Sequence, residues 1–121
     1  MNEKQFRFQD MKVWERGADI SVPLFRMADG LERQRLYRFA EQLRGATMSI
    51  TNNIAEGSGS DSNADFAHFL NMARRSIFEV ANILMLLGRK GHFQVAETTP
   101  LLRDLEEQSR MILSFRRTLK S

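Results

Sequence analysis

The chain has 121 residues, enough for one domain with a single core, and its 42% apolar and 27% charged residues are typical of a globular protein. It contains no cysteine, which excludes disulfides and thiolate metal sites, and neither a long apolar run nor a signal-peptide pattern. We therefore expect a cytoplasmic protein that does not enter a membrane. The formal net charge is +3, and fourteen of the eighteen basic residues are arginine, which binds phosphate and carboxylate bidentately.

The first ten residues show no hydrophobic period and predict an N-terminal arm, residues 1–10, that docks on the rest of the chain through Phe6 or Phe8. Asp10 is a suitable N-cap for a first helix at about residues 11–28.

Two breaker signals divide the next part of the chain. Pro23 either bends or breaks the first helix, because proline removes an amide donor and crowds the carbonyl four residues earlier. Asp29–Gly30 then predicts a turn before a second helix at about residues 32–56. Gly57 is predicted to end this helix in the left-handed conformation, and the glycine–serine stretch 57–61 to form the next loop.

The second helix carries two stripes at helical spacing. Its apolar stripe predicts burial in a core, and the stripe beside it is small or polar throughout. The first consists of Leu36, Phe39, Leu43, Thr47, Ile50 and Ile54, and the second of Gln42, Ala46, Ser49, Asn53 and Glu56.

The third helix, at about residues 63–90, has an N-cap in Ser62 and a stop signal in Gly91. Its segment 80–88 is apolar almost all round, yet it is too short to span a membrane. We therefore expect a second copy of the chain to cover this segment, with Ile83, Met85 and Leu86 as candidate interface residues.

Thr99–Pro100 predicts the start of a fourth helix at about residues 100–120, because proline is favoured at the first helical position after a capping threonine. Four helices joined by short connections predict an all-α, antiparallel up-down four-helix bundle in a single domain.

Several segments also resemble the bacterial four-helix bundle family of 23S rRNA intervening-sequence proteins, encoded within insertions in large-subunit ribosomal RNA genes. A distant relative is the accessory protein of diversity-generating retroelements. The resemblance is carried by Phe8, Asp10, Met11, Val13 and Trp14, by Tyr37, Gln42–Arg44, Ala46, Ser49, Ile50 and Asn53–Gly57, and by Phe66, Phe69, Leu70, Ala73, Ser76 and Glu79.

The resemblance implies a four-helix bundle that assembles as a cyclic homopentamer. It also implies a link to nucleic acid, because the retroelement relative binds nucleic acid and a reverse transcriptase through a basic surface. The sequence departs from the family pattern at Gly45, where a second arginine usually follows Arg44, at Thr51, which replaces a common proline, and at Pro23.

Polar residues of the second and third helices permit two interpretations. In the structural one, which we favour, they bond to one another at a subunit contact, because neutral donor–acceptor side chains beside a carboxylate satisfy each other. In the functional one they line a ligand pocket. The residues are Ser49, Asn53, Glu56, Ser76 and Glu79.

No pattern predicts catalysis. Neither His68 nor His92 follows a glutamate at the spacing of a di-iron site, and the glycine–serine loop lacks the lysine of a phosphate-binding loop. We therefore expect no enzyme activity, no cofactor and no metal.

Four arginines lie close together in the sequence, at Arg33, Arg35, Arg38 and Arg44. In a single copy they are most simply a solvated face balanced by nearby glutamates. A cyclic oligomer repeats each of them around its axis and builds a field strong enough to hold a phosphate backbone, without base readout.

The sequence thus predicts a non-enzymatic, oligomeric accessory or scaffold protein that associates with RNA or DNA through these arginines. The alternative is a protein-interaction module for a reverse transcriptase or a ribosome-associated partner, without direct nucleic-acid binding.

Overall fold

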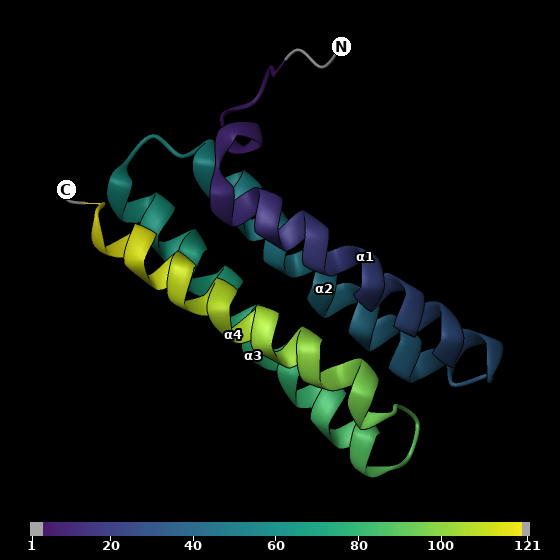
Figure 1. Cartoon of the computed structure of the whole chain (residues 1–121). Coiled ribbons are helices and arrows are strands. Elements are labelled where there is room, and N and C mark those ends of the chain that lie inside the picture. The colour runs from purple at the N-terminus through teal and green to yellow at the C-terminus, as the bar shows by residue number, and fades with distance from the viewer. Residues whose placement is uncertain (1–3, 120–121) are drawn as a thin grey trace.

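Four long helices form the part of the chain that the computed structural model describes, residues 4–119 (Figure 1). Each helix packs on the next, and α4 packs back on α1, so the predicted all-α up-down four-helix bundle is confirmed. The elements are a 3-10 turn η1 (Arg7–Asp10) followed by α1 (Lys12–Arg33), α2 (Tyr37–Ser58), α3 (Asn63–Arg89) and α4 (Val95–Arg117).

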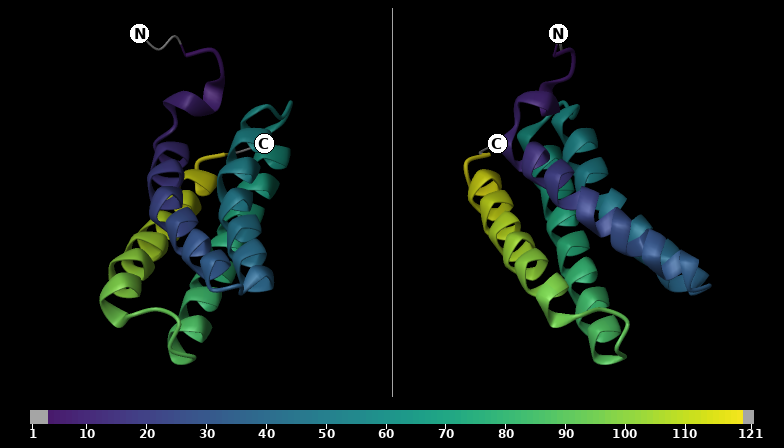
Figure 2. Two further views of the ribbon diagram at one scale, coloured as in Figure 1. Left: turned by 90° about the vertical axis from the view of Figure 1, so that its right-hand side faces the viewer. Right: turned by 45° about the vertical axis from the view of Figure 1, so that its right-hand side comes forward.

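The two ends of the bundle differ in what they carry. The α1–α2 and α3–α4 turns lie at one end, and η1, the α2–α3 loop and the end of α4 lie at the other (Figure 2). The core between them follows the predicted stripes: on α2, Leu43, Thr47, Ile50 and Ile54 are buried, and α3 buries Phe66, Leu70, Ala73, Ile77, Val80, Leu84 and Leu87.

The N-terminal arm docks through an aromatic contact. Phe8 packs on Trp14 with ring centroids 5.0 Å apart, while Phe6 stacks on Phe8 and stays exposed. Asp10 does not cap α1, because it belongs to η1 and pairs with Lys4 at 2.9 Å. The first three residues of the predicted arm lie outside the described part of the chain.

Helix α1 is unbroken at Pro23, in agreement with the predicted helix at about residues 11–28, which contains this proline. It continues past the predicted turn, because Asp29–Gly30 is helical. The reason is tertiary: Leu31 is 1% exposed and continues the buried spacing of Leu24 and Ala28, so core packing outweighs the local turn propensity.

The turn falls instead at Gln34–Leu36. The Leu36 amide donates to the Leu31 carbonyl at 2.9 Å, and the Arg35 amide donates to the Glu32 carbonyl at 2.8 Å. This is a Schellman motif with Arg35 in the position that glycine usually takes, at a φ of 65°. Arg33 therefore ends α1 and does not belong to α2.

Helix α2 continues beyond the predicted stop. Gly57 lies inside it, outside the left-handed region, and α2 ends at Ser58. The glycine is required for close approach, because a Cβ there would lie 2.6 Å from the Phe69 Cβ and 2.9 Å from the Phe66 ring.

Both predicted signals around α3 are confirmed. Ser62 Oγ accepts the Asp65 amide at 3.1 Å and caps the start of the helix. Gly91, at a φ of 85°, closes its end, where the His92 amide donates to the Leu87 carbonyl at 2.9 Å.

Helix α4 begins five residues earlier than predicted. Glu97 Oε1 accepts the Gln94 amide at 2.9 Å, and Thr98 is buried, so the first turn is already helical before Pro100. Pro100 and Ala96, whose carbonyl it leaves without an amide partner, are both exposed, so the lost hydrogen bond falls on the solvent side.

Helices α1 and α4 form the thinnest of the four seams, and they meet closely at Gly17. A Cβ there would lie 2.8 Å from Gln108 Nε2 and 2.9 Å from Thr51 Cγ2. Gln108 is fully buried and donates from Nε2 to the Val13 carbonyl at 3.2 Å.

We expect Gly57→Ala to destabilise the protein by about 1–3 kcal/mol, because the added methyl overpacks the contact between α2 and α3. The matched control is Gly45→Ala on the same helix, where a Cβ meets nothing within 4 Å and helix propensity should stabilise by up to about 1 kcal/mol. Urea unfolding measures both variants. Equal effects at the two positions would refute the close-approach account.

We expect Arg35→Gly to be about 1 kcal/mol more stable than Arg35→Ala, because only glycine takes a φ of 65° without a Cβ penalty. Both variants remove the same charge, so the difference in their free energies of unfolding isolates the backbone term. No difference would show that the turn relaxes to another conformation.

Candidate nucleic-acid interface

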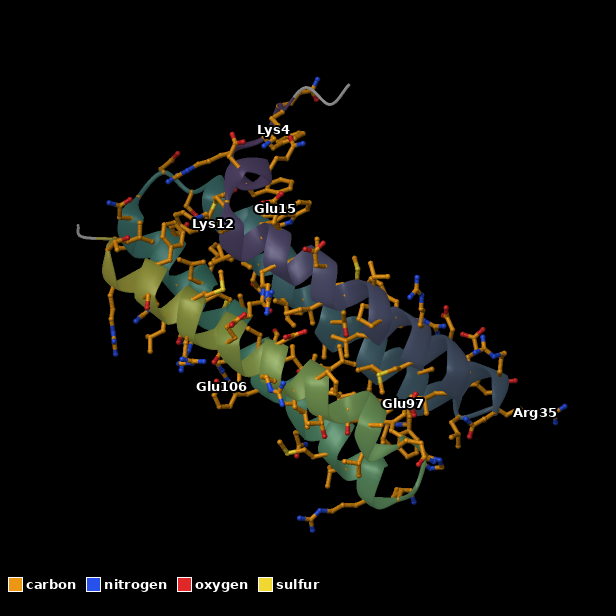
Figure 3. The ribbon with its side chains drawn as sticks, in the orientation of Figure 1. Lys4, Lys12, Glu15, Arg35, Glu97 and Glu106 are labelled. Carbon is orange, nitrogen blue, oxygen red and sulfur yellow. The ribbon has the colours of Figure 1, made fainter. Side chains whose placement is uncertain are left out.

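The two turns place a group of basic side chains at one end of the bundle. Arg33 ends α1, Arg35 lies in the α1–α2 turn and Arg38 lies in the first turn of α2; all three are exposed. Arg35 projects away from the helices (Figure 3). Within residues 4–119 none of the three forms an ion pair, so three of the four predicted arginines share one open surface.

Arg44 differs from the other three. It donates to Asp29 and to Glu32, both at 2.6 Å, and so ties α2 to the last two turns of α1. The hydrogen bond with Asp29, and then that with Glu32, raises the pKa of the Arg44 guanidinium above its ordinary value. Arg44 therefore offsets one of the two negative charges of Asp29 and Glu32 and is itself already engaged.

Four further side chains lie at the same end of the bundle, although they were not among the predicted site residues. They were nevertheless foreseeable, because in an up-down bundle the first and third connections lie at the same end. The His92 ring reaches α2, with its centroid 6.2 Å from that of Phe39. The four are Arg26, Arg89, Lys90 and His92.

We call residues 26–44 and 89–97 the basic end. It contains seven Arg and Lys side chains and four carboxylates, an excess of three, which equals the formal net charge of the whole chain. The remainder of the chain is therefore balanced. Two of the four carboxylates, Asp29 and Glu32, are held by Arg44, which leaves the other six cations without a paired acid.

The basic end also contains a hollow of about 320 Å³ between the last turns of α1 and the α3–α4 turn. Its floor is apolar: Leu31 is 1% exposed and Phe93 8% exposed. Charged and polar groups surround the floor, with Arg26 and Arg33 on α1 and His92 and Glu97 on the opposite side.

The predicted polar residues meet between α2 and α3. Ser76 Oγ and Ser49 Oγ are 2.8 Å apart, and Asn53 Nδ2 donates to Ser49 Oγ at 3.0 Å. A hollow of about 430 Å³ lies beside these hydrogen bonds. It is lined by Ser49, Asn53, Ser76 and Glu79 but not by Glu56. Three of the five therefore bond to one another and four of the five line the hollow, so both interpretations stay open, and their place at a subunit contact stays a prediction.

The predicted oligomer residues do not share one environment. Met85 and Leu86 are each 54% exposed, whereas Ile83 is half-buried and packs against the core of its own bundle. Phe78, which was not among the predicted interface residues, is 60% exposed and lies seven residues before Met85. Phe78, Met85 and Leu86 together form what we call the α3 outer face.

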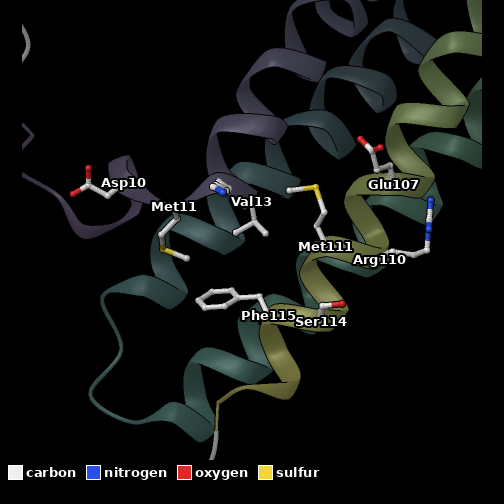
Figure 4. A pocket seen from close by; sticks show the side chains of 9 residues that line it. Asp10, Met11, Val13, Glu107, Arg110, Met111, Ser114 and Phe115 are labelled. Carbon is white, nitrogen blue, oxygen red and sulfur yellow. The ribbon is translucent and has the colours of Figure 1, made fainter.

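A groove of about 670 Å³ separates the start of α1 from the end of α4. Four apolar side chains turn toward one another across it, namely Met11, Val13, Met111 and Phe115 (Figure 4). Asp10, Lys12, Glu107 and Arg110 lie at its edge.

No cluster of three or more His, Asp or Glu side chains suited to a metal occurs among residues 4–119. None of the helices in that range is long and apolar enough to cross a membrane.

Fold and surface together define a small all-α bundle protein whose excess positive charge lies at one end. The chain belongs to the 23S rRNA-intervening sequence protein family, whose model matches residues 9–114. The resemblance seen in the sequence is thereby confirmed.

A solved structure supports the fold. The chain is similar to a crystal structure of a protein with unknown function from the S23 ribosomal protein family of Bacteroides thetaiotaomicron VPI-5482, with a TM-score of 0.81 and 24% identity. The match covers 86% of this chain and 97% of that one. No curated protein matches the sequence.

Proposed function

We propose that this chain is a non-enzymatic accessory or scaffold protein that contacts the phosphate backbone of RNA or DNA through its basic end. The observation that carries this proposal is the separation of charge: the basic end has an excess of three positive charges, equal to the net charge of the chain, and six of its seven cations pair with no acid within residues 4–119. Membership of a family named for sequences within 23S rRNA agrees with such a partner.

A single copy offers only a modest field, so the proposal includes self-assembly. The α3 outer face leaves three large apolar side chains in water, and burying them against a second copy would lower the free energy. A cyclic homo-oligomer, a pentamer by family resemblance, repeats the basic end around one axis and raises the local potential at a nucleic-acid backbone.

The second candidate function is a protein-interaction module for a reverse transcriptase or a ribosome-associated partner. The groove between α1 and α4 favours it, because apolar side chains ringed by charges are typical of a site for another protein.

Binding of mixed-sequence RNA and DNA at two salt concentrations tests the first candidate. Affinity should fall steeply as salt rises, because bound arginines release counterions from the backbone. Replacing Arg33, Arg38 and Lys90 with Gln should weaken binding and reduce the slope of log affinity against log salt by about one per lost contact. Fluorescence anisotropy measures both quantities.

The control replaces Arg103, Arg110 and Arg117 of α4 with Gln, which changes the net charge equally but leaves the basic end intact. Equal weakening by the two triple variants would show that position does not matter. Absent or salt-insensitive binding would refute the first candidate and support the protein-interaction module.

The double variant Met85→Glu with Leu86→Glu should dissociate the oligomer, since both side chains are exposed in the single chain and would be buried as charges at the subunit contact. Sedimentation velocity measures the mass. Val22→Glu with Met48→Glu, at similarly exposed positions on α1 and α2, should leave the oligomer intact. A monomeric wild-type protein at high concentration would refute the assembly.

A further inference from the structure

The hollow at the basic end combines two chemistries in one small space. Its mouth on α1 is cationic: Arg26 and Arg33 line it, and neither belongs to an ion pair within residues 4–119. The Arg33 side chain folds back along its helix, because its Nη2 lies 3.7 Å from where a Cβ on Gly30 would stand. An anion entering the hollow therefore meets a guanidinium at the mouth.

The interior has a different character. Leu31 and Phe93 form an apolar floor, and Met27 adds a flexible thioether beside them. The planar His92 ring also lines the hollow and makes a tilted contact with Phe39, at 6.2 Å between centroids. A flat apolar group is the chemistry that such a floor and ring accept.

Glu97, on α4, determines the direction in which a ligand would lie in the hollow. Glu97 lines the hollow from α4, where its Oε1 accepts the Gln94 amide at 2.9 Å. Its carboxylate repels a phosphate, whereas Arg26 and Arg33 attract one. A ligand with an anionic part and a flat apolar part therefore places the anion toward α1 and the flat part toward the α3–α4 turn.

A nucleotide is such a ligand. We propose that the hollow holds one unpaired nucleotide, with its phosphate at Arg26 and Arg33 and its base between the apolar floor and the His92 ring. Only an unpaired base reaches it, because the bases of a duplex are stacked and paired inside the helix. The inference rests on the proposed function, and it adds that the basic end distinguishes single-stranded from duplex nucleic acid.

Gly30 allows a direct test, because it lines the hollow and a Cβ there would have only Arg33 Nη2 within 4 Å, at 3.7 Å. Gly30→Leu fills the hollow while every charge of the basic end is kept. We expect it to lower the affinity for a labelled single-stranded RNA of mixed sequence about tenfold, the loss of about one stacked base. Its affinity for the same RNA annealed to its complement should not change.

Gly45→Leu is the matched control, a substitution of the same kind at an open position of α2, and it should leave both affinities unchanged. His92→Ala is a second variant that removes the ring without filling the space, and it should weaken single-strand binding several-fold. Circular dichroism melting confirms that each variant is folded.

The outcomes separate the two proposals. If the wild-type protein binds neither RNA, the proposed function fails and this inference fails with it. If it binds both and neither Gly30→Leu nor His92→Ala changes the single-strand affinity selectively, this inference alone fails. Equal loss for both RNAs, or equal competition by a polyglutamate peptide, would show that the hollow accepts any polyanion and would also overturn it.

Discussion

Helices α1 and α4 approach each other closely where Gly17 meets Gln108. Without a Cβ at Gly17, the fully buried Gln108 side chain reaches the backbone of α1 and donates to the Val13 carbonyl. Hollows flank this point along the same seam, the groove toward η1 and the smaller hollow at the basic end. The two hollows thus lie on either side of a close contact that a residue without a side chain permits.

Arg44 has two effects on the charges at the basic end. Arg44 joins α2 to α1 by binding Asp29 and Glu32, so one internal contact stabilises the turn end and also removes the nearest acids from competition. The remaining cations of the basic end stay available to solvent. The proposed interface for a polyanion therefore needs no large net charge, because the rest of the chain is balanced.

Much of this fold was predictable from the sequence, and the misses share one cause. The bounds of α3 were nearly right because Ser62 and Gly91 act locally. The end of α1 and the start of α4 were wrong because burial of Leu31 and Thr98 overrides the local signals of Asp29–Gly30 and Thr99–Pro100. Likewise, the grouping of Arg33 with Arg35 and Arg38 followed from proximity in sequence, whereas the pairing of Arg44 depends on the register between two helices, which no sequence pattern shows.

Each of the two turns at the basic end has one residue in the left-handed conformation, and the two residues differ in type. The α3–α4 turn uses Gly91 for its left-handed position, whereas the α1–α2 turn holds Arg35 there against its conformational preference. Selection for thermostability alone would replace this arginine with glycine and would remove one exposed positive charge from the basic end. Thermostability and the proposed nucleic-acid contact therefore favour different residues at position 35.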